Sequence, residues 1–365
     1  MKAAALFFAV LFLSAACTQQ DRYIAITGYA QGGTYSVKLN LRGENGIIGT
    51  DPEKVKEGID SVLDAVNNSV SGYNKGSLLS RFNSGEKVIP DRIFRDLYRE
   101  SYRYYEETDG SFDVSCAPLF DIWGFGFTSD SLPSPEKIRA VLAGTGMDKL
   151  ADTLVTDSGG YTSAAMILKS CREASANASG TPDDVMLPEL NFNAIAQGYS
   201  CDLVAEYLHS LGVNQMLVDV GGEIYCEGFN PSGQPWGIGL DRPVDGNDTP
   251  GEDLQGIFRA GPEPCGVVTS GNYRKFYVRD GKKYAHTIDP KTGCPVTHSL
   301  LCATVIAGNA TEADALATYC MVIGFEKARD FILSRPDLEG CLVYDEDGQM
   351  KTWTSPALDF LSKSR

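Results

Sequence analysis

Two Asp-Gly dipeptides, Asp280-Gly281 and Asp347-Gly348, each stand between two strand-like runs of residues. An Asp-Gly pair in this setting is typical of a two-residue β-hairpin turn, because the turn needs backbone conformations that these residues tolerate. Strands joined by such turns pair antiparallel. The sequence therefore favours folds in which neighbouring strands are joined by tight turns rather than by crossover helices.

Helical segments are interspersed among these strands. Asp51 can cap a helix that has Pro52 in its first turn and apolar residues on one face. Further helices are predicted within residues 90–110, 134–144, 198–212 and 311–324. No fixed-period repeat and no linker divides the chain. We therefore predict an α+β fold with mixed, mostly antiparallel sheets and packed helices, in a single large domain over residues 31–356 followed by a tail, 357–365.

The N-terminus has the pattern of an export signal. Lys2 precedes an apolar run, and three small residues precede Cys17. This resembles a bacterial lipobox, although Ser14 stands where a large aliphatic residue is usual. We expect residues 1–16 to be a lipoprotein signal peptide, Cys17 to be lipidated, and 17–30 to be a tether. The mature protein would then be anchored in the bacterial cell envelope and face the periplasm; ordinary signal cleavage is the alternative.

Charge and cysteine content restrict the ligands. The net charge of −16 argues against nucleic-acid binding, and a phosphate-bearing substrate would need a bridging cation. The chain has ten cysteines and no C-x-x-C pair, so we expect most of them to be core residues. Cys294 and His298 form an isolated C-x₃-H without a second pair to complete a zinc site.

The segment "TEADALAT" places Asp314 and Thr318 one helical turn apart, so that both can direct oxygen atoms to one hard cation. Alternatively, Thr311 caps the helix and Asp314 is its partner in a capping box. Only three histidines occur, and His286 stands between a strand-like run and a polar turn. It can transfer a proton, or it can hydrogen-bond at the end of a hairpin.

Eight segments in order resemble the ApbE family of periplasmic, often lipidated, FAD:protein FMN transferases. They cover nearly the whole mature chain: "GGTYSV", "SGYNKGSLLSRFN", "DGSFDVSCAPLFDIWGFG", "NFNAIAQGYSCD", "VDVGGEIYCEG", "SGNYRKFY", "HTIDPKTGCP" and "EADALAT". The resemblance implies an enzyme that transfers FMN from FAD to a threonine hydroxyl of an exported acceptor protein and releases AMP. The implied acceptors are subunits of membrane redox complexes, such as the sodium-pumping NADH:quinone oxidoreductase and the Rnf complex.

The resemblance also implies the site residues. Mg²⁺ would be held by Asp314, Thr318 and the Ala194 carbonyl, and His286 would be the catalytic base. Contacts to FAD would come from Gly32, Tyr73, Ser111, Phe112, Asp113, Asn191, Gln197 and Ile288. The chain departs from the family at three of these positions. The family often has methionine at Gly32, aspartate at Asn191, and lysine or glutamate at Gln197, so charge is missing beside the flavin.

Two other functions remain open from the sequence. Water could replace the acceptor threonine, which would make the protein a metal-dependent FAD pyrophosphatase that yields FMN and AMP. The uncharged Asn191 and Gln197 leave room for a non-catalytic FAD-binding lipoprotein. Incubation with FAD, Mg²⁺ and an acceptor domain distinguishes the three, because only the transferase adds the mass of FMN to the acceptor.

Overall fold

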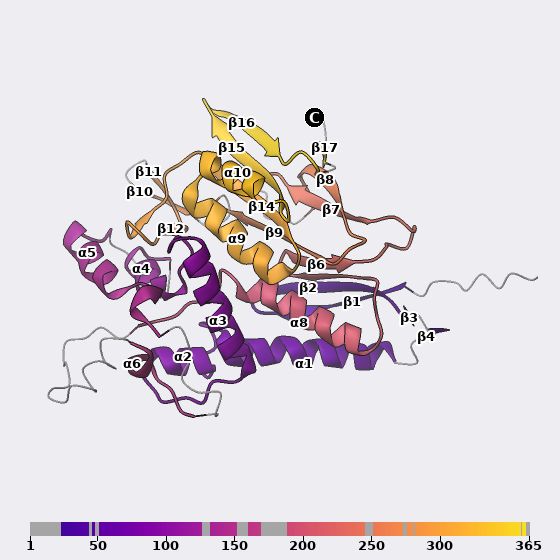
Figure 1. Ribbon diagram of the computed structural model, residues 1–365, viewed down its shortest axis with the longest axis horizontal. Helices are drawn as coiled ribbons and strands as arrows, with labels where there is room; N and C mark the ends of the chain where they lie inside the picture. The colour runs from indigo at the N-terminus through magenta and orange to yellow at the C-terminus, as the bar shows by residue number, and fades with distance from the viewer. Residues whose placement is uncertain are drawn as a thin grey trace, which may run out of the picture.

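An eight-stranded, entirely antiparallel sheet forms the centre of the molecule (Figure 1). The computed structural model describes residues 23–43, 46–47, 51–125, 132–151, 160–168, 188–244, 251–272, 276–279, 282–358 and 360–362. The strands of the sheet, in spatial order, are β1 (Tyr23–Ala30), β2 (Gly33–Asn40), β5 (Met216–Val220), β6 (Glu223–Glu227), β9 (Cys265–Gly271), β14 (Leu300–Ala307), β15 (Glu339–Glu346) and β16 (Gln349–Thr354). This confirms the predicted α+β class with mostly antiparallel sheets.

Smaller sheets surround the central one. Their strands are β7 (Trp236–Asp241), β8 (Leu254–Ala260) and β17 (Phe360–Ser362) in one sheet, and the pairs β3 (Arg42–Gly43) with β4 (Gly46–Ile47), β10 (Phe276–Arg279) with β11 (Lys282–Ala285), and β12 (Ile288–Asp289) with β13 (Cys294–Pro295). Both predicted Asp-Gly hairpins are found, as β10–β11 and β15–β16. In the second turn Asp347 and Gly348 have φ values of 55° and 78°, the region that such a turn requires. Residues 280–281 lie outside the described residues.

The helices lie mainly on one side of the central sheet. They are α1 (Pro52–Val70), α2 (Leu78–Asn83), α3 (Arg92–Glu107), α4 (Ala117–Ile122), α5 (Pro135–Gly144), α6 (Ala164–Ile167), α8 (Ala196–Ser210), α9 (Ala310–Ile323) and α10 (Phe325–Ser334), with 3₁₀ turns η1 (Val114–Cys116) and η2 (Met147–Lys149). The predicted cap of α1 is confirmed, since the Asp51 carboxylate accepts from the Glu53 N–H at 3.1 Å.

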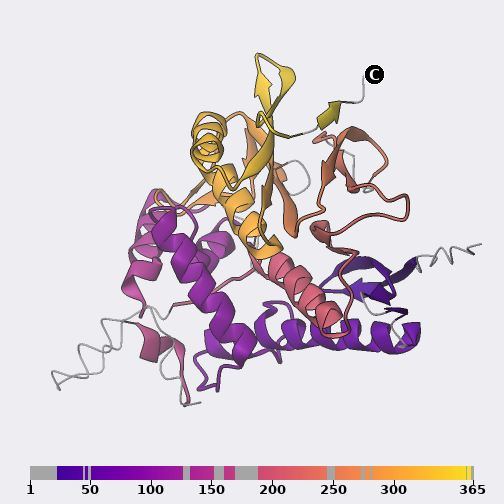
Figure 2. The same cartoon turned by 45° about the vertical axis from the view of Figure 1, so that its right-hand side comes forward.

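Two central helices cover successive parts of the sheet. α9 contacts β9 and β14, whereas α8 contacts β5, β6 and α1. Figures 1 and 2 show α9 and α8 following one another diagonally, with α1 running beneath α8. The N-terminus of α8 therefore meets the N-terminal half of α9 near the middle of the molecule. Within the described residues, no helix has the length and apolar character needed to cross a membrane.

The cysteines are mostly core residues, as predicted. Of the eight described cysteines, six are buried and two are half-buried, all as free thiols. Cys171 lies outside the described residues. One of the core clusters fills the space between the central sheet and the β7–β8–β17 sheet, and it includes Cys226, Trp236 and Phe258.

The predicted domain boundaries need two corrections. Residues 23–30, assigned to the tether, form β1, which pairs with β2 along its whole length and buries Ile26. Within the predicted tail, residues 360–362 form β17, whose backbone pairs with β8. Both segments belong to the folded domain because their strands complete the edges of sheets.

Candidate active site

α8 and α9 lie in close contact at Gly198. Its backbone N–H donates a hydrogen bond to Asp314 Oδ2 at 3.0 Å. A Cβ atom on Gly198 would lie 2.3 Å from the Ala310 carbonyl oxygen and 2.8 Å from the Asp314 Cβ. The two helices can approach this closely only because residue 198 has no side chain. A glycine inside a helix thus places a backbone donor against a carboxylate of the neighbouring helix.

The Asp314 carboxylate is buried without a cationic partner. Its residue is 4% exposed, and among the described side chains no salt bridge joins it to lysine, arginine or histidine. Burial raises its pKa to about 7; the Gly198 hydrogen bond opposes this shift, and the charge of Asp202 adds to it. A buried carboxylate in this state is suited to binding a metal ion, which would supply the missing positive charge.

The capping-box interpretation of Asp314 is wrong. The N-cap of α9 is Asn309, whose side chain accepts from the Glu312 N–H at 2.8 Å. Asp202 of α8 accepts from the backbone N–H groups of Ala310 at 2.9 Å and Thr311 at 2.8 Å. The first donors of α9 are therefore occupied by other side chains, and the Asp314 carboxylate takes no part in capping its own helix.

The other two predicted metal ligands lie near this carboxylate in the fold. Thr318 follows Asp314 by one helical turn, and its Oγ1 lies 3.5 Å from the Ser270 Oγ of β9. Ala194 lies in the turn that leads into α8, shortly before Gly198. Among the described residues no cluster of three or more histidine, cysteine or acidic side chains could hold a metal. A metal site here would therefore combine one carboxylate with hydroxyl and carbonyl oxygens.

Asn191 lies beside the segment that follows α3. Its backbone N–H donates to the Val114 carbonyl at 2.8 Å, and its side-chain oxygen accepts from the Asn193 N–H at 2.9 Å. The preceding Leu190 exchanges two hydrogen bonds with the Asn83 side chain at the end of α2, at 2.8 and 2.9 Å. The irregular segment before α8 is thus held by elements from two other regions of the chain.

Ser111 and Phe112 are buried, and Asp113 is half-buried. The Phe112 ring packs edge-on against Tyr104 with 5.9 Å between centroids, so its side chain belongs to the core. Asp113 Oδ1 accepts from the Ser115 N–H at 2.8 Å and the Ser115 hydroxyl at 2.6 Å. Burial raises the pKa of Asp113 to about 6, and the Ser115 hydrogen bonds oppose that shift.

Two hairpin turns lie at the N-terminus of α8. A Cβ atom on Gly221, in the β5–β6 turn, would be 2.2 Å from the Gln197 Nε2, so the Gln197 amide occupies that space. Gln31 of the β1–β2 turn donates to the Ser200 Oγ at 2.6 Å, which places the neighbouring Gly32 close to the same helix end. A helix N-terminus bordered by tight turns presents backbone N–H groups to an anion.

Tyr73 is exposed, in contrast to most of the predicted contacts. It lies between α1 and α2 and is 66% accessible to solvent. The same α1–α2 turn leads through α2 to Asn83, whose side chain holds Leu190. An exposed aromatic ring at this position is available for stacking on a planar ligand.

His286 follows β11 and precedes β12. Its ring and that of Phe125 make an edge contact with centroids 6.5 Å apart. The adjacent Thr287 donates its hydroxyl to the Asn272 Oδ1 at 2.6 Å, which joins this segment to the end of β9. Ile288 is 3% exposed and packs with Trp123, so only its backbone is available to a ligand.

The other two histidines have structural partners. His298 Nε2 lies 2.7 Å from the Met321 carbonyl, and burial lowers the pKa of this imidazole. This contact excludes His298 from the C-x₃-H zinc pattern. His209 Nε2 lies 2.9 Å from a carboxylate oxygen of buried Glu227 on β6. The neighbour of His286, Thr287, joins this segment to the end of β9, the strand whose Ser270 contacts Thr318.

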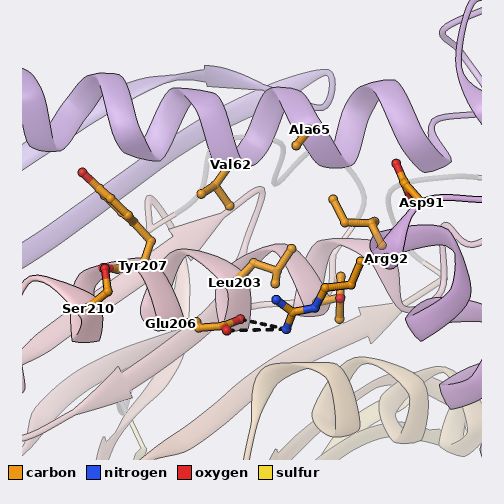
Figure 3. A pocket seen from close by; sticks show the side chains of 10 residues that line it. Val62, Ala65, Asp91, Arg92, Leu203, Glu206, Tyr207 and Ser210 are labelled. Carbon is orange, nitrogen blue, oxygen red and sulfur yellow. Dashed lines mark hydrogen bonds and ion pairs between the residues drawn. The ribbon is translucent and has the colours of Figure 1, made fainter.

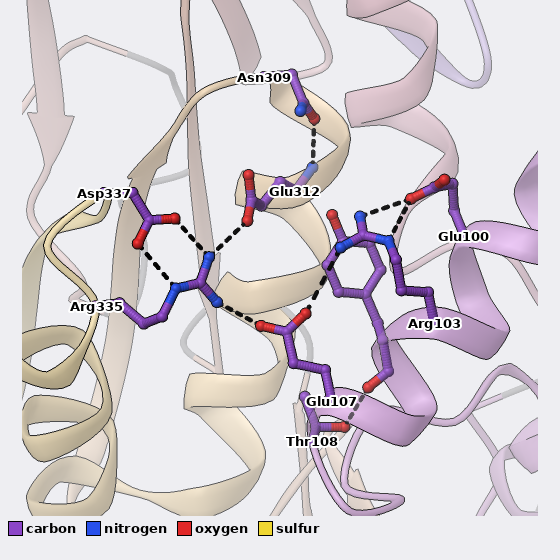
Figure 4. A network of polar contacts seen from close by, with 9 residues as sticks. Glu100, Arg103, Glu107, Thr108, Asn309, Glu312, Arg335 and Asp337 are labelled. Atoms are coloured by element: carbon purple, nitrogen blue, oxygen red, sulfur yellow. Dashed lines mark hydrogen bonds and ion pairs between the residues drawn. The ribbon is translucent and has the colours of Figure 1, made fainter.

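An ion-pair network joins α3 to α9 (Figure 4). Arg103 pairs with Glu100 at 2.6 Å and with Glu107 at 3.6 Å, both on α3. Arg335 pairs with the same Glu107 and, at 3.0 Å, with Glu312 of α9. The network fixes the end of α3, from which Ser111 to Asp113 continue, beside the helix that carries Asp314.

A separate pocket of about 460 Å³ lies between α1, the start of α3 and α8 (Figure 3). Val62, Ala65 and Leu203 contribute apolar side chains, and the Arg92–Glu206 ion pair, 3.3 Å long, lies along it. None of the predicted site residues lines this pocket. Its volume alone therefore does not identify it as the active site.

The sequence did not reveal the roles of Gly198 and Asp202. A glycine within a predicted helix is a signal of close packing, and this signal was present in "AQGYSCD". Asp202 caps a helix more than 100 residues away, at Ala310 and Thr311, and no local pattern indicates such a partner. Both residues determine how α9 presents Asp314.

Comparison with known proteins identifies the fold and the family. The profile of the ApbE family matches residues 32–342. FAD:protein FMN transferase of Haemophilus influenzae is 32% identical over 357 residues, which cover 96% of this chain and 95% of that protein. The Escherichia coli K12 protein of the same name is 34% identical over 310 residues, covering 83% and 80%. The apo crystal structure of Pseudomonas stutzeri flavinyl transferase ApbE superposes with a TM-score of 0.74 at 31% identity, covering 93% of this chain and 96% of that one.

Proposed function

Because the chain belongs to the ApbE family and is an FAD:protein FMN transferase, we propose that it uses Mg²⁺ to transfer FMN to a threonine hydroxyl of an exported acceptor. The acceptor oxygen would attack the phosphorus of the FMN half of FAD. A new P–O bond forms, the bond to the bridging oxygen breaks, and AMP leaves with that oxygen. The acceptor is proposed to be a subunit of a membrane redox complex.

The observation that carries this proposal is the buried Asp314 carboxylate. It is 4% exposed, lacks a cationic partner among the described residues, and has a pKa raised to about 7 chiefly by burial. Oxygen atoms of Asp314, Thr318 and Ala194 are the type of donor that Mg²⁺ prefers. Bound Mg²⁺ would neutralise the charge of the pyrophosphate. The chemistry of the donors therefore fits the metal.

The residues around this carboxylate have distinct proposed roles. Gly198 holds one Asp314 oxygen through its N–H, which leaves the other oxygen for the cation. The N-terminus of α8, bordered by the Gly221 and Gly32 turns, would direct the positive end of its helix dipole towards the phosphates. Tyr73, exposed at its turn, would stack on the isoalloxazine ring.

His286 is the proposed general base. An imidazole ionises near neutral pH and can accept the proton of the acceptor hydroxyl as the oxygen attacks. The other two histidines are engaged with Met321 and Glu227, so neither is a substitute. The bond between Thr287 and Asn272 holds the backbone beside His286 against β9.

We also propose that the chain is exported and lipidated at Cys17. The N-terminal sequence supports this through its positive start, apolar run and small residues before the cysteine. A lipid anchor would keep the enzyme at the membrane where acceptors of this class lie.

The test is a reaction with FAD, Mg²⁺ and a purified acceptor domain, followed by mass spectrometry of the acceptor. Addition of FMN to one threonine, with release of AMP, is the expected result. Release of FMN and AMP with an unmodified acceptor would instead identify water as the nucleophile. Addition of FMN at a residue other than threonine would contradict the proposed acceptor chemistry.

A further inference from the structure

Two cysteines face one another at one end of the β6–β9 ladder. Cys226 of β6 lies directly opposite Cys265, the first residue of β9. Their sulfur atoms are 3.6 Å apart, although the residues are 39 positions apart in the sequence. No feature of the FAD site includes this pair.

The pair stands at the base of a long excursion of the chain. Between the two cysteines the chain leaves the central sheet, forms β7 and β8, and returns. Just beyond the pair, the Gly228 N–H donates to the Pro262 carbonyl at 2.8 Å. The Trp236 Nε1 of β7 donates to the Glu227 carbonyl at 2.8 Å, which folds the excursion back over β6.

The backbone geometry suits a covalent bond between the two sulfurs. Directly opposed residues of antiparallel strands have Cα atoms about 4.5–5.5 Å apart, within the range of about 4.4–6.8 Å found for disulfides. Side-chain rotation can therefore bring the sulfurs from contact to bonding distance while the strands stay in place.

The two thiols differ in access and acidity. Cys226 is fully buried beneath the β7–β8–β17 sheet, whereas Cys265 is half-buried. The two thiols share a hydrogen bond in which either sulfur can be the donor, and this contact lowers the pKa of Cys265 and raises that of Cys226. Cys265 is therefore the nucleophile that meets an external oxidant first.

We propose that Cys226 and Cys265 form a stabilising disulfide by exchange with an external protein or small-molecule disulfide. The Cys265 thiolate attacks the oxidant, forms a mixed disulfide and expels one thiolate. Cys226 then attacks the Cys265 sulfur and expels the second thiolate. The two protein thiols lose two protons and two electrons, and the oxidant disulfide is reduced to two thiols. Such oxidants occur in the compartment to which the N-terminal signal would direct the chain.

The bond would close the base of the β7–β8 excursion. A cross-link between strands already in register restrains the unfolded chain more than the folded one. The native sheet therefore needs little rearrangement to accommodate it, and FMN transfer is expected to continue in both redox states.

The experiment oxidises the full-length protein with oxidised glutathione after complete reduction. Free thiols are then blocked in denaturant, and peptides are mapped without reductant. The expected result is a peptide pair joined through Cys226 and Cys265, with two fewer blocked thiols. If both cysteines are recovered in blocked form, or if each is joined to another cysteine, the proposal is overturned.

Single variants test the order of attack. Cys226→Ala should accumulate glutathione on Cys265, because the resolving thiol is absent. Cys265→Ala should leave Cys226 unmodified, since that thiol is buried. Cys294→Ala, which removes the other half-buried thiol, should form the cross-link as the wild type does. Glutathione on Cys226 in the Cys265→Ala variant would contradict the proposed order.

A melting experiment tests whether the disulfide stabilises the folded protein. The oxidised wild type should melt roughly 5 °C or more above the reduced protein, and this difference should disappear in Cys226→Ala. Equal melting temperatures of the cross-linked and reduced wild type would refute the structural role of the bond.

Discussion

Replacing Asp314 with asparagine should stabilise the metal-free protein above neutral pH. The carboxylate is 4% exposed, and burial is the main cause that raises its pKa from 3.8 to about 7. Between these values the folded state holds a proton that the unfolded state has released. The contribution of the Asp314 carboxyl group to the free energy of unfolding therefore falls as pH rises from 3.8 to about 7. Asparagine keeps an oxygen that can accept from Gly198 but carries no charge.

The magnitude follows from the shift in pKa. A shift of about 3 units at about 1.4 kcal/mol per unit gives at most about 4 kcal/mol by which the ionised carboxylate destabilises the metal-free fold. In EDTA at pH 8, Asp314→Asn should therefore exceed the wild type in free energy of unfolding by up to that amount. Near pH 4 most of the advantage should be gone, because the folded carboxylate is then protonated and the unfolded one is close to half protonated.

Mg²⁺ should reverse the order of the two proteins. The wild type should gain stability on titration with Mg²⁺, whereas the variant should gain little and should lose FMN transfer. Denaturant titrations at pH 4, 6 and 8, with EDTA or Mg²⁺, measure all of these differences. Glu326→Gln is the matched control, since its side chain is 71% exposed and should change stability by less than about 0.5 kcal/mol. The reasoning would be refuted if the difference in free energy of unfolding between the variant and the wild type did not change with pH, and if Mg²⁺ stabilised the two proteins equally.

Three further predictions test the packing, the base and the anchor. Gly198→Ala should destabilise the protein by about 1–3 kcal/mol and weaken FAD binding, because its Cβ would lie 2.3 Å from a backbone oxygen; Gly237→Ala, with a nearest neighbour at 3.8 Å, should show neither effect in melting and flavin titration. His286→Ala should bind FAD but transfer FMN about 10²–10⁴-fold more slowly and lose the acidic limb of the pH–rate profile. His209→Gln should keep the wild-type profile in the same assay, and a wild-type rate for His286→Ala at pH 5–8 would make that residue structural. Mass spectrometry of the native N-terminal peptide should find acyl chains on Cys17, and an unlipidated mature terminus elsewhere would exclude this anchor.

Local signals predicted the elements that carry them. The predicted cap at Asp51 placed the start of α1, and its side chain accepts a hydrogen bond in the first turn of that helix. The Asp-Gly turn at Asp347 placed the last hairpin. The six-residue α2 was not predicted, because so short a helix lacks periodicity, and its Ser77 cap resembles a turn residue.

Long-range contacts were beyond local patterns. β2 pairs with β5 although nearly half of the chain lies between them, and Asp202 of α8 caps α9. The spacing of Asp314 and Thr318 placed both residues on one helix face but could not separate metal binding from capping. The Asn309 cap, which is local to α9, and the Gly198 contact, which depends on how α8 meets α9, exclude capping by Asp314. Metal binding stays a prediction.

The contact between Gly198 and Asp314 also has a consequence for the order of events during synthesis. The two residues are 116 positions apart, so a ribosome that adds about 5–20 residues per second needs roughly 6–23 s to make the second after the first. During that interval α8 can pack against α1 but not against α9, and the Gly198 N–H has no Asp314 carboxylate beside it. If FAD binds at the proposed site, it would therefore be bound only after α9 has been made, and a nascent chain stalled before Ala310 should retain no flavin once free FAD has been removed.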